Sequence, residues 1–205
     1  MNAARRAVLV ALVVSLGALT GCTTSSEAMP SSSPSIEPPA VAEPVATPTV
    51  PPLDPGDMST WVVGSAGIGP IERGESWAAV QGQLDGIATE SMCPSTVILT
   101  ADASPDVYVG LEADGDTIRQ VWAAGDASDV KSPATAAGIT LGATVVDVEA
   151  AYPGIVESVI PYPAGKTAYA VDDTEGSWIV FSLRDEVVTQ IGASEAEYPP
   201  KELCG

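Results

Sequence analysis

The chain has 205 residues, with 27 Asp and Glu against 8 Lys and Arg and no histidine, so its formal net charge is −19. Nucleic-acid binding through a basic face is excluded, because phosphate recognition needs a concentration of Lys and Arg that this chain lacks. The missing imidazole excludes histidine-based catalysis, and a hydrophobic content of 45% favours a globular protein over a wholly disordered one.

The first 22 residues have the build of a bacterial export signal. Two arginines precede an apolar run over 7–19, which is shorter than the about twenty residues that a membrane-spanning helix needs. The run ends in the sequence Leu19-Thr20-Gly21-Cys22. This ending resembles the lipobox of bacterial lipoproteins, which implies removal of residues 1–21 and a diacylglycerol thioether on Cys22. We therefore expect lipid anchoring in the cell membrane, on its extracytoplasmic face; the alternative is an uncleaved anchor helix.

Residues 22–57 are predicted to be a disordered tether. Residues 23–57 contain nine prolines, six serines and four threonines, with no Lys or Arg. Such a composition lacks apolar periodicity and buries too little surface to offset the entropy of ordering. Signal removal takes away two arginines and no acidic residue, which moves the formal charge from −19 to −21.

The remaining residues, 58–205, are long enough to form one folded domain. They contain two cysteines, Cys93 and Cys204. With Cys22 modified by lipid, an even pair in an oxidising compartment predicts a disulfide that ties the C-terminal tail to the middle of the domain. A redox-active or nucleophilic pair is the alternative, but the chain has no C-x-x-C motif and no histidine to lower a thiol pKa.

The domain shows an internal repeat with a period near 70 residues. Three pairs of like residues lie 68 positions apart: Gly74 and Gly142, Ser76 and Thr144, and Val80 and Val148. Residues 118–121 match 188–191 at a spacing of 70. We therefore expect two copies of one unit, at about 66–130 and 135–205.

Each copy begins with a predicted helix. Ser76 and Thr144 are suitable N-cap residues, and Val80, Leu84 and Ile87 fall on one helical face in the first copy. β-branched and aromatic runs then predict strands. The expected strands are 96–101, 107–111 and 117–123 in the first copy, and 166–171, 177–183 and 187–192 in the second.

The predicted fold class is α+β, with two tandem repeats of a helix followed by an antiparallel meander. This pattern, with its shared Gly-x-Ser/Thr start, resembles the repeats of secreted β-lactamase inhibitory proteins and the small lipoproteins of outer-membrane barrel assembly. The resemblance implies a sheet with helices on one face and an open face that binds another protein. It carries over no contact residues, because only the start of each unit matches.

No catalytic group stands out, and no cofactor or metal is expected. Two acidic hairpins, 112–116 and 172–176, are candidate calcium loops, but neither has the spacing of a known calcium loop and ordinary turns explain both. The leading hypothesis is therefore a non-catalytic module that binds a protein or another envelope component. The alternatives are a carboxylate-dependent envelope hydrolase and an acidic structural protein of the wall layer.

Four aromatic residues on expected strands form the candidate binding face: Tyr108, Trp122, Tyr169 and Trp178. The hypothesis requires their side chains to share the sheet face that points away from the helices. A core position is the alternative for each tryptophan, because large aromatic side chains on strands are often buried.

Overall fold

The computed structural model describes residues 52–129, 131–162, 167–172 and 176–204. The expected signal peptide, Cys22 and most of the expected tether lie outside the described residues. Within the described residues, no helix is long and apolar enough to cross a bilayer.

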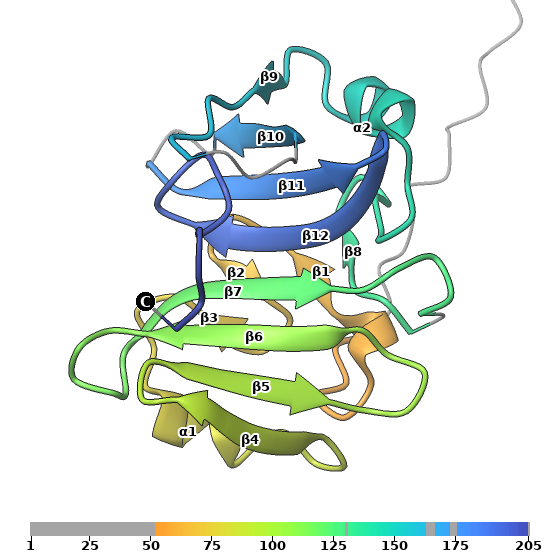
Figure 1. Ribbon diagram of the computed structural model, residues 1–205. Helices are drawn as coiled ribbons and strands as arrows, with labels where there is room; N and C mark the ends of the chain where they lie inside the picture. Colours follow the sequence, from red (N-terminus) through yellow and green to blue (C-terminus); the bar gives the residue numbers. More distant parts are fainter. Residues whose placement is uncertain (1–51, 130, 163–166, 173–175, 205) are drawn as a thin grey trace, which may run out of the picture. The chain divides into compact units, whose positions relative to one another are not determined.

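An antiparallel sheet of eight strands forms most of the folded part (Figure 1). The strand order is β4-β5-β6-β7-β12-β11-β10-β9. The strands are β4 Ala88–Cys93, β5 Thr96–Thr100, β6 Asp106–Leu111, β7 Ile118–Ala124, β9 Val156–Glu157, β10 Thr167–Asp172, β11 Trp178–Arg184 and β12 Val187–Ser194. Strands β4 to β7 make one meander and β9 to β12 another, and the two join where β7 pairs with β12. The six strands expected from the sequence are all present, within two residues of their expected bounds.

A second, smaller sheet lies behind the first in the view of Figure 1. It contains β1 Val62–Val63, β2 Gly67–Ile68, β3 Ile71–Glu72 and β8 Ala134–Thr135, in the order β3-β2-β1-β8. A 3-10 turn, η1 Met58–Thr60, precedes it. Strands β2 and β3 contact β7, so this sheet covers the middle of the larger one. The sequence did not predict it.

The two α-helices attach to the large sheet through equivalent backbone contacts. Helix α1 is Trp77–Gln81 and helix α2 is Val145–Ala151. Before them, Gly74 and Gly142 have φ angles of 85° and 82°. The Gly74 N–H donates to Ile118 at 2.7 Å, and the Gly142 N–H donates to Val188 at 2.9 Å. A left-handed backbone at both positions explains why each segment needs glycine.

The predicted α+β class is wrong, because the fold is mostly β. The described residues form twelve strands and only two short α-helices, of five and seven residues. The first helix was expected to continue to Ile87, but it ends at Gln81. Gly86 has a φ of 79°, which no right-handed helix accommodates. Leu84 and Ile87 are still buried, but they reach the core from turns.

The main hydrophobic core lies between the large sheet, the small sheet and the helices. Alternate residues of the large sheet point into it, because successive side chains on a strand face opposite sides. Val107, Val121, Phe181 and Ile191 are among the fully buried side chains there. A smaller cluster of Trp122, Ala168, Ala170 and Val180 lies on the opposite side of the sheet, which we call the open face.

Candidate binding face

The structure brings three of the four predicted aromatic residues together on the open face. Tyr108 pairs directly with Trp122 across β6 and β7. Tyr108 and Trp178 both pack against the cluster that contains Trp122. Tyr169 lies on the other face, because it pairs with Phe181 and packs against the main core. The predicted face is therefore made of Tyr108, Trp122 and Trp178, without Tyr169.

Trp122 is buried within this face, with an exposed fraction of 2%. It pairs with Gly192 of β12, and a Cβ atom built at Gly192 would lie 2.2 Å from the Trp122 ring. The ring therefore packs directly on the Gly192 backbone, at the join between the two meanders. Its indole Nε1–H donates to the Gln120 side chain at 3.1 Å, which satisfies the polar group of a buried tryptophan.

The C-terminal tail, residues 195–204, covers Trp122. Cys204 forms a disulfide with Cys93 of β4, 111 residues earlier in the chain. Beside it, the buried Thr96 hydroxyl donates to the Leu203 carbonyl at 2.6 Å, and Leu203 packs against the Trp122 cluster. Figure 1 shows the tail leaving β12 and passing in front of the sheet. The cysteine pair therefore fastens the tail over the open face.

The tail is also held along its length. The Tyr162 hydroxyl donates to the Pro199 carbonyl, and the Tyr162 ring meets Tyr198 edge to face with centroids 6.4 Å apart. Burial raises the pKa of Tyr162 above its usual value. The phenol therefore keeps its proton at neutral pH and can serve as the donor in this contact.

A pocket of about 400 Å³ lies between the tail and the sheet. Tyr108 and Trp122 supply aromatic surface, Gln190 supplies an amide, and Met92 on β4 is exposed at 54%. Burial, together with the nearby Asp106 carboxylate, raises the pKa of Tyr108, so its phenol is neutral. Aromatic and thioether walls with a few polar groups suit an apolar side chain with a polar end.

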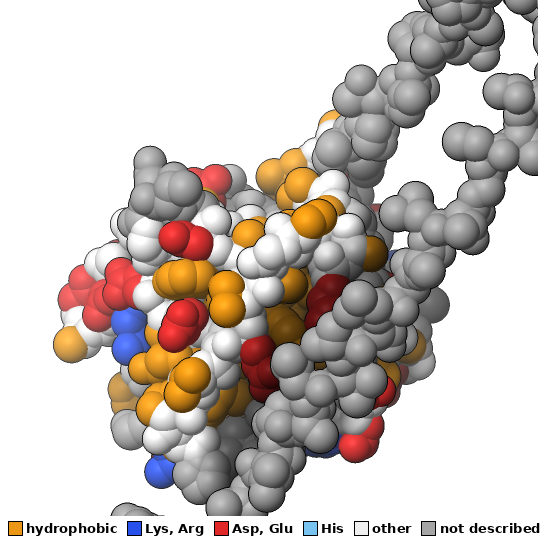
Figure 2. Space-filling view, turned by 90° about the horizontal axis from the view of Figure 1, so that it is seen from above, with side chains coloured by type: hydrophobic (Ala, Val, Ile, Leu, Met, Phe, Trp, Pro, Cys, Tyr) orange, Lys and Arg blue, Asp and Glu red, His pale blue; other side chains and the backbone are white. Residues whose placement is uncertain are grey.

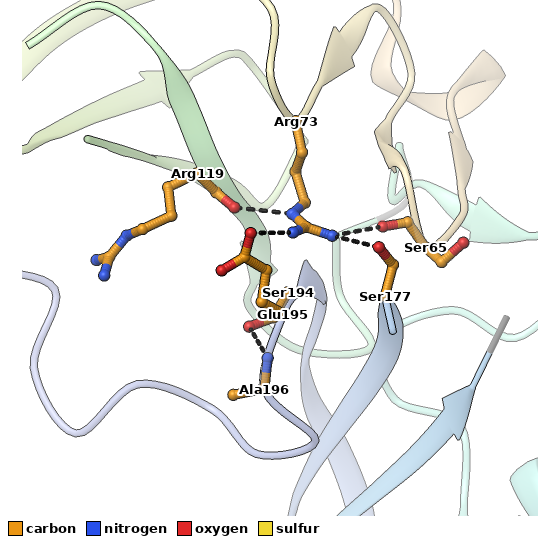
Figure 3. Close-up of polar contacts among 7 residues, drawn as sticks. All are labelled: Ser65, Arg73, Arg119, Ser177, Ser194, Glu195 and Ala196. Carbon is orange, nitrogen blue, oxygen red and sulfur yellow. Dashed lines mark hydrogen bonds and ion pairs between the residues drawn. The ribbon is translucent and has the colours of Figure 1, made fainter. Parts of the chain in front are cut away.

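The Arg73 guanidinium makes several polar contacts at a separate place in the fold (Figure 3). Its guanidinium donates to the Arg119 carbonyl at 2.8 Å, to the Ser177 hydroxyl at 2.9 Å and to the Ser65 carbonyl at 3.4 Å. It also forms an ion pair with Glu195 at 3.1 Å. Only 11% of the Arg73 side chain is exposed. Because its partners lie between β1 and β2, on β7, just before β11 and at the start of the tail, the guanidinium links these four segments.

Replacing Arg73 by lysine should lower the free energy of unfolding by about 1.5–3 kcal/mol, because lysine lacks the planar fork that makes these bonds. Arg119→Lys is the matched control. In Figure 3 the Arg119 side chain points away from the cluster, so that change should cost less than about 0.5 kcal/mol. Urea unfolding curves measure both values. Equal losses in the two variants would contradict the assigned role of Arg73.

The acidic turns are ordered by their own hydrogen bonds. Asp114 accepts bonds from the Thr117 hydroxyl and from the backbone N–H groups of Asp116 and Thr117. These bonds, the Thr117 hydroxyl first, hold the pKa of Asp114 below its usual value. Among the described residues, no group of three or more acidic or cysteine side chains could hold a metal ion. The second predicted calcium loop, 172–176, lies partly outside the described residues.

These bonded carboxylates predict a loss of stability in acid. A lowered pKa means that Asp114 stabilises the fold above about pH 4, and that this stabilisation disappears as the pH falls through the lower, folded-state value. Asp114→Asn should therefore melt below the wild type at pH 6, and the difference should shrink as the pH falls from 6 through the lowered folded-state pKa of Asp114. Melting temperatures across this range measure it, and a difference independent of pH would contradict the assignment.

Sequence reasoning missed Arg73 and most residues of the tail. Arg73 follows a glycine-rich segment with no periodic signal, and its partners lie on four separate segments. The cysteine pair was the one signal that placed the tail near the middle of the domain.

No protein-family model, curated protein or solved structure matches this chain.

Proposed function

We propose that the protein is a lipid-anchored, extracytoplasmic lipoprotein whose domain binds a segment of another protein without catalysis. The partner segment inserts an apolar side chain into the pocket between the open face and the C-terminal tail. The observation that carries this proposal is the pocket itself, where Met92 and Tyr108 offer apolar surface to solvent beside the buried Trp122 and the polar Gln190.

The chemistry of the pocket supports binding by a protein. Interface anchors are most often aromatic or aliphatic side chains that fill a desolvated pocket, with polar groups around the rim. Here Lys201 and Glu202 of the tail lie at the pocket beside the aromatic floor, and both side chains are exposed. Charged rim groups of both signs favour a polar partner surface around one apolar anchor.

The membrane anchor rests on the sequence ending at Cys22. Mass spectrometry of the mature protein should find an N-terminal peptide that begins at Cys22 and carries diacylglycerol. Cys22→Ala should abolish the lipid mass and release the protein from membranes. A wild-type protein without lipid would refute the anchor while leaving the binding pocket untouched.

A photo-crosslinking amino acid at position 92 tests the binding proposal in intact cells. The same amino acid at Leu53, which is exposed but does not line the pocket, is the matched control. We expect a discrete crosslinked protein from position 92 and none from position 53. The purified partner should then bind Tyr108→Ala about thirtyfold more weakly than wild type, the factor expected for an interface anchor. Equal crosslinking at both positions, or unchanged affinity, would refute the pocket as the binding site.

A further inference from the structure

Strand β9 lies at one edge of the large sheet, and among the described residues no strand pairs with its outer side. Its residues Val156 and Glu157 pair with Ala170 and Tyr169 of β10. The Ser158 N–H continues the ladder by donating to the Ala168 carbonyl at 2.8 Å. Because bonding directions alternate along an antiparallel strand, the backbone N–H and C=O groups of Glu157 and Val159 point outward, away from β10.

Exposed valines lie on this same edge. The exposed fractions of Val156 and Val159 are 64% and 81%, and Val159 is the most exposed large hydrophobic residue among those described. A third exposed valine, Val146, is on α2. Figure 2 looks down on this end of the molecule and shows hydrophobic side chains at the surface between acidic ones. We call Val156, Glu157 and Val159 the β9 rim.

A shallow acidic pocket of about 210 Å³ lies beside the β9 rim. Glu157, Asp185 and Glu186 line it, together with Tyr169 and one basic residue, Arg184. Burial first, and then the charges of Glu157, Glu149 and Glu186, raise the pKa of Tyr169. The electrostatic potential at this rim is therefore negative, and it favours a cation in the pocket.

We propose that the β9 rim binds an extended, basic segment of another protein, which adds to the large sheet as a ninth strand. The outward N–H and C=O groups of Glu157 and Val159 supply backbone hydrogen bonds. On the face that Glu157 shares with Tyr169, Lys or Arg side chains of the segment reach Glu157 and Glu186, and on the opposite face its small apolar side chains cover Val156. This surface is separate from the open-face pocket, so either proposal can fail without the other.

The charge of the rim decides against a second copy of this chain as the occupant. Pairing β9 with β9 of another molecule would bring the acidic residues of both copies together, which is unfavourable. The usable edge is also short, because Pro153 and Pro161 bound it and proline cannot donate to a ladder. A segment of about six residues matches this length.

The test uses the full mature chain in detergent micelles at 0.15 M salt. The probe is a six-residue peptide of alternating lysine and valine. Two control peptides have the same length: one replaces lysine by glutamate, and the other keeps lysine but carries N-methyl groups along one edge. Binding is measured by calorimetry, and NMR follows the amide signals of Glu157 and Val159. We expect the lysine peptide alone to bind and to protect these two amides from hydrogen exchange.

The matched protein variants are Glu157→Lys and Glu90→Lys. Each variant reverses the charge of one exposed acidic residue on an edge strand, but Glu90 lies on β4, at the opposite edge of the sheet. Glu157→Lys should weaken the peptide at least about tenfold more than Glu90→Lys. Equal weakening would mean general attraction to an acidic protein and would overturn the proposal. Equal binding of the N-methylated peptide would overturn strand addition, and sedimentation showing dimers that Glu157→Lys dissociates would assign the rim to a second copy.

Discussion

Replacing Trp122 by alanine should lower the free energy of unfolding by about 3–5 kcal/mol, the range for a large buried aromatic side chain. The ring is 2% exposed and fills the space between Gly192 and Leu203. For a domain of about 150 residues this loss corresponds to a fall in melting temperature of roughly 10 °C. Trp178→Ala is the control on the same face, and its smaller loss follows from its only partly buried position.

A substitution at Gly192 tests the packing of the Trp122 ring from the other side of the contact. A Cβ at position 192 would lie 2.2 Å from the Trp122 ring, so Gly192→Ala should cost about 1–3 kcal/mol through overpacking. In the double variant with Trp122→Ala, the space left by the ring accommodates the new methyl group. The two losses should therefore be less than additive. Strict additivity, or a Trp122→Ala protein as stable as wild type, would show that the ring is not packed on Gly192.

Removing the disulfide should lower the free energy of unfolding about as much as Trp122→Ala does. Cys93→Ala with Cys204→Ala opens a loop with a sequence separation of 111. The chain-entropy model gives about 4.7 kcal/mol for a loop of this order, and measured losses in small secreted domains are about 2–5 kcal/mol. The tail should also loosen, which exposes Trp122 to water and, in a background that keeps Trp122 as its one tryptophan, shifts the emission to the red. Urea unfolding and emission spectra measure the two effects.

Thr96→Val is the matched control for the disulfide. It removes the hydrogen bond to the Leu203 carbonyl but leaves the covalent bond in place. Its loss should be about 1 kcal/mol, with little change in the Trp122 emission. A disulfide variant with unchanged stability and unchanged emission would show that non-covalent contacts alone hold the tail on the sheet.

Six of the eight strands of the large sheet could be predicted, because they are rich in β-branched and aromatic residues and are separated by turn residues. The runs at 96–101 and 177–183 are clear examples. Strands β4 and β9 were not predicted. The small sheet could not be predicted, because strands of two residues are too short to show a period. It lies in a segment with several glycines, which sequence reasoning reads as a loop.

The class was predicted wrongly because helical periodicity continued past the true end of a helix. Val80, Leu84 and Ile87 have helical spacing and all three are buried, but only Val80 is helical. Burial alone can produce that spacing when turns direct apolar residues into a core. Tyr169 was placed on the wrong face of the sheet for a related reason. The sequence placed each aromatic residue on a strand, but it did not determine which of the two faces the side chain occupies.

The join between β7 and β12 has a consequence for how the protein acquires its fold. Each meander is local in sequence, but the central pair of the sheet brings together strands far apart along the chain. Such non-local pairing slows folding, and until it occurs both inner edges are open to wrong partners. Because Trp122 packs on Gly192 across this join, the emission of a variant that keeps Trp122 as its one tryptophan would report the moment at which the two halves meet.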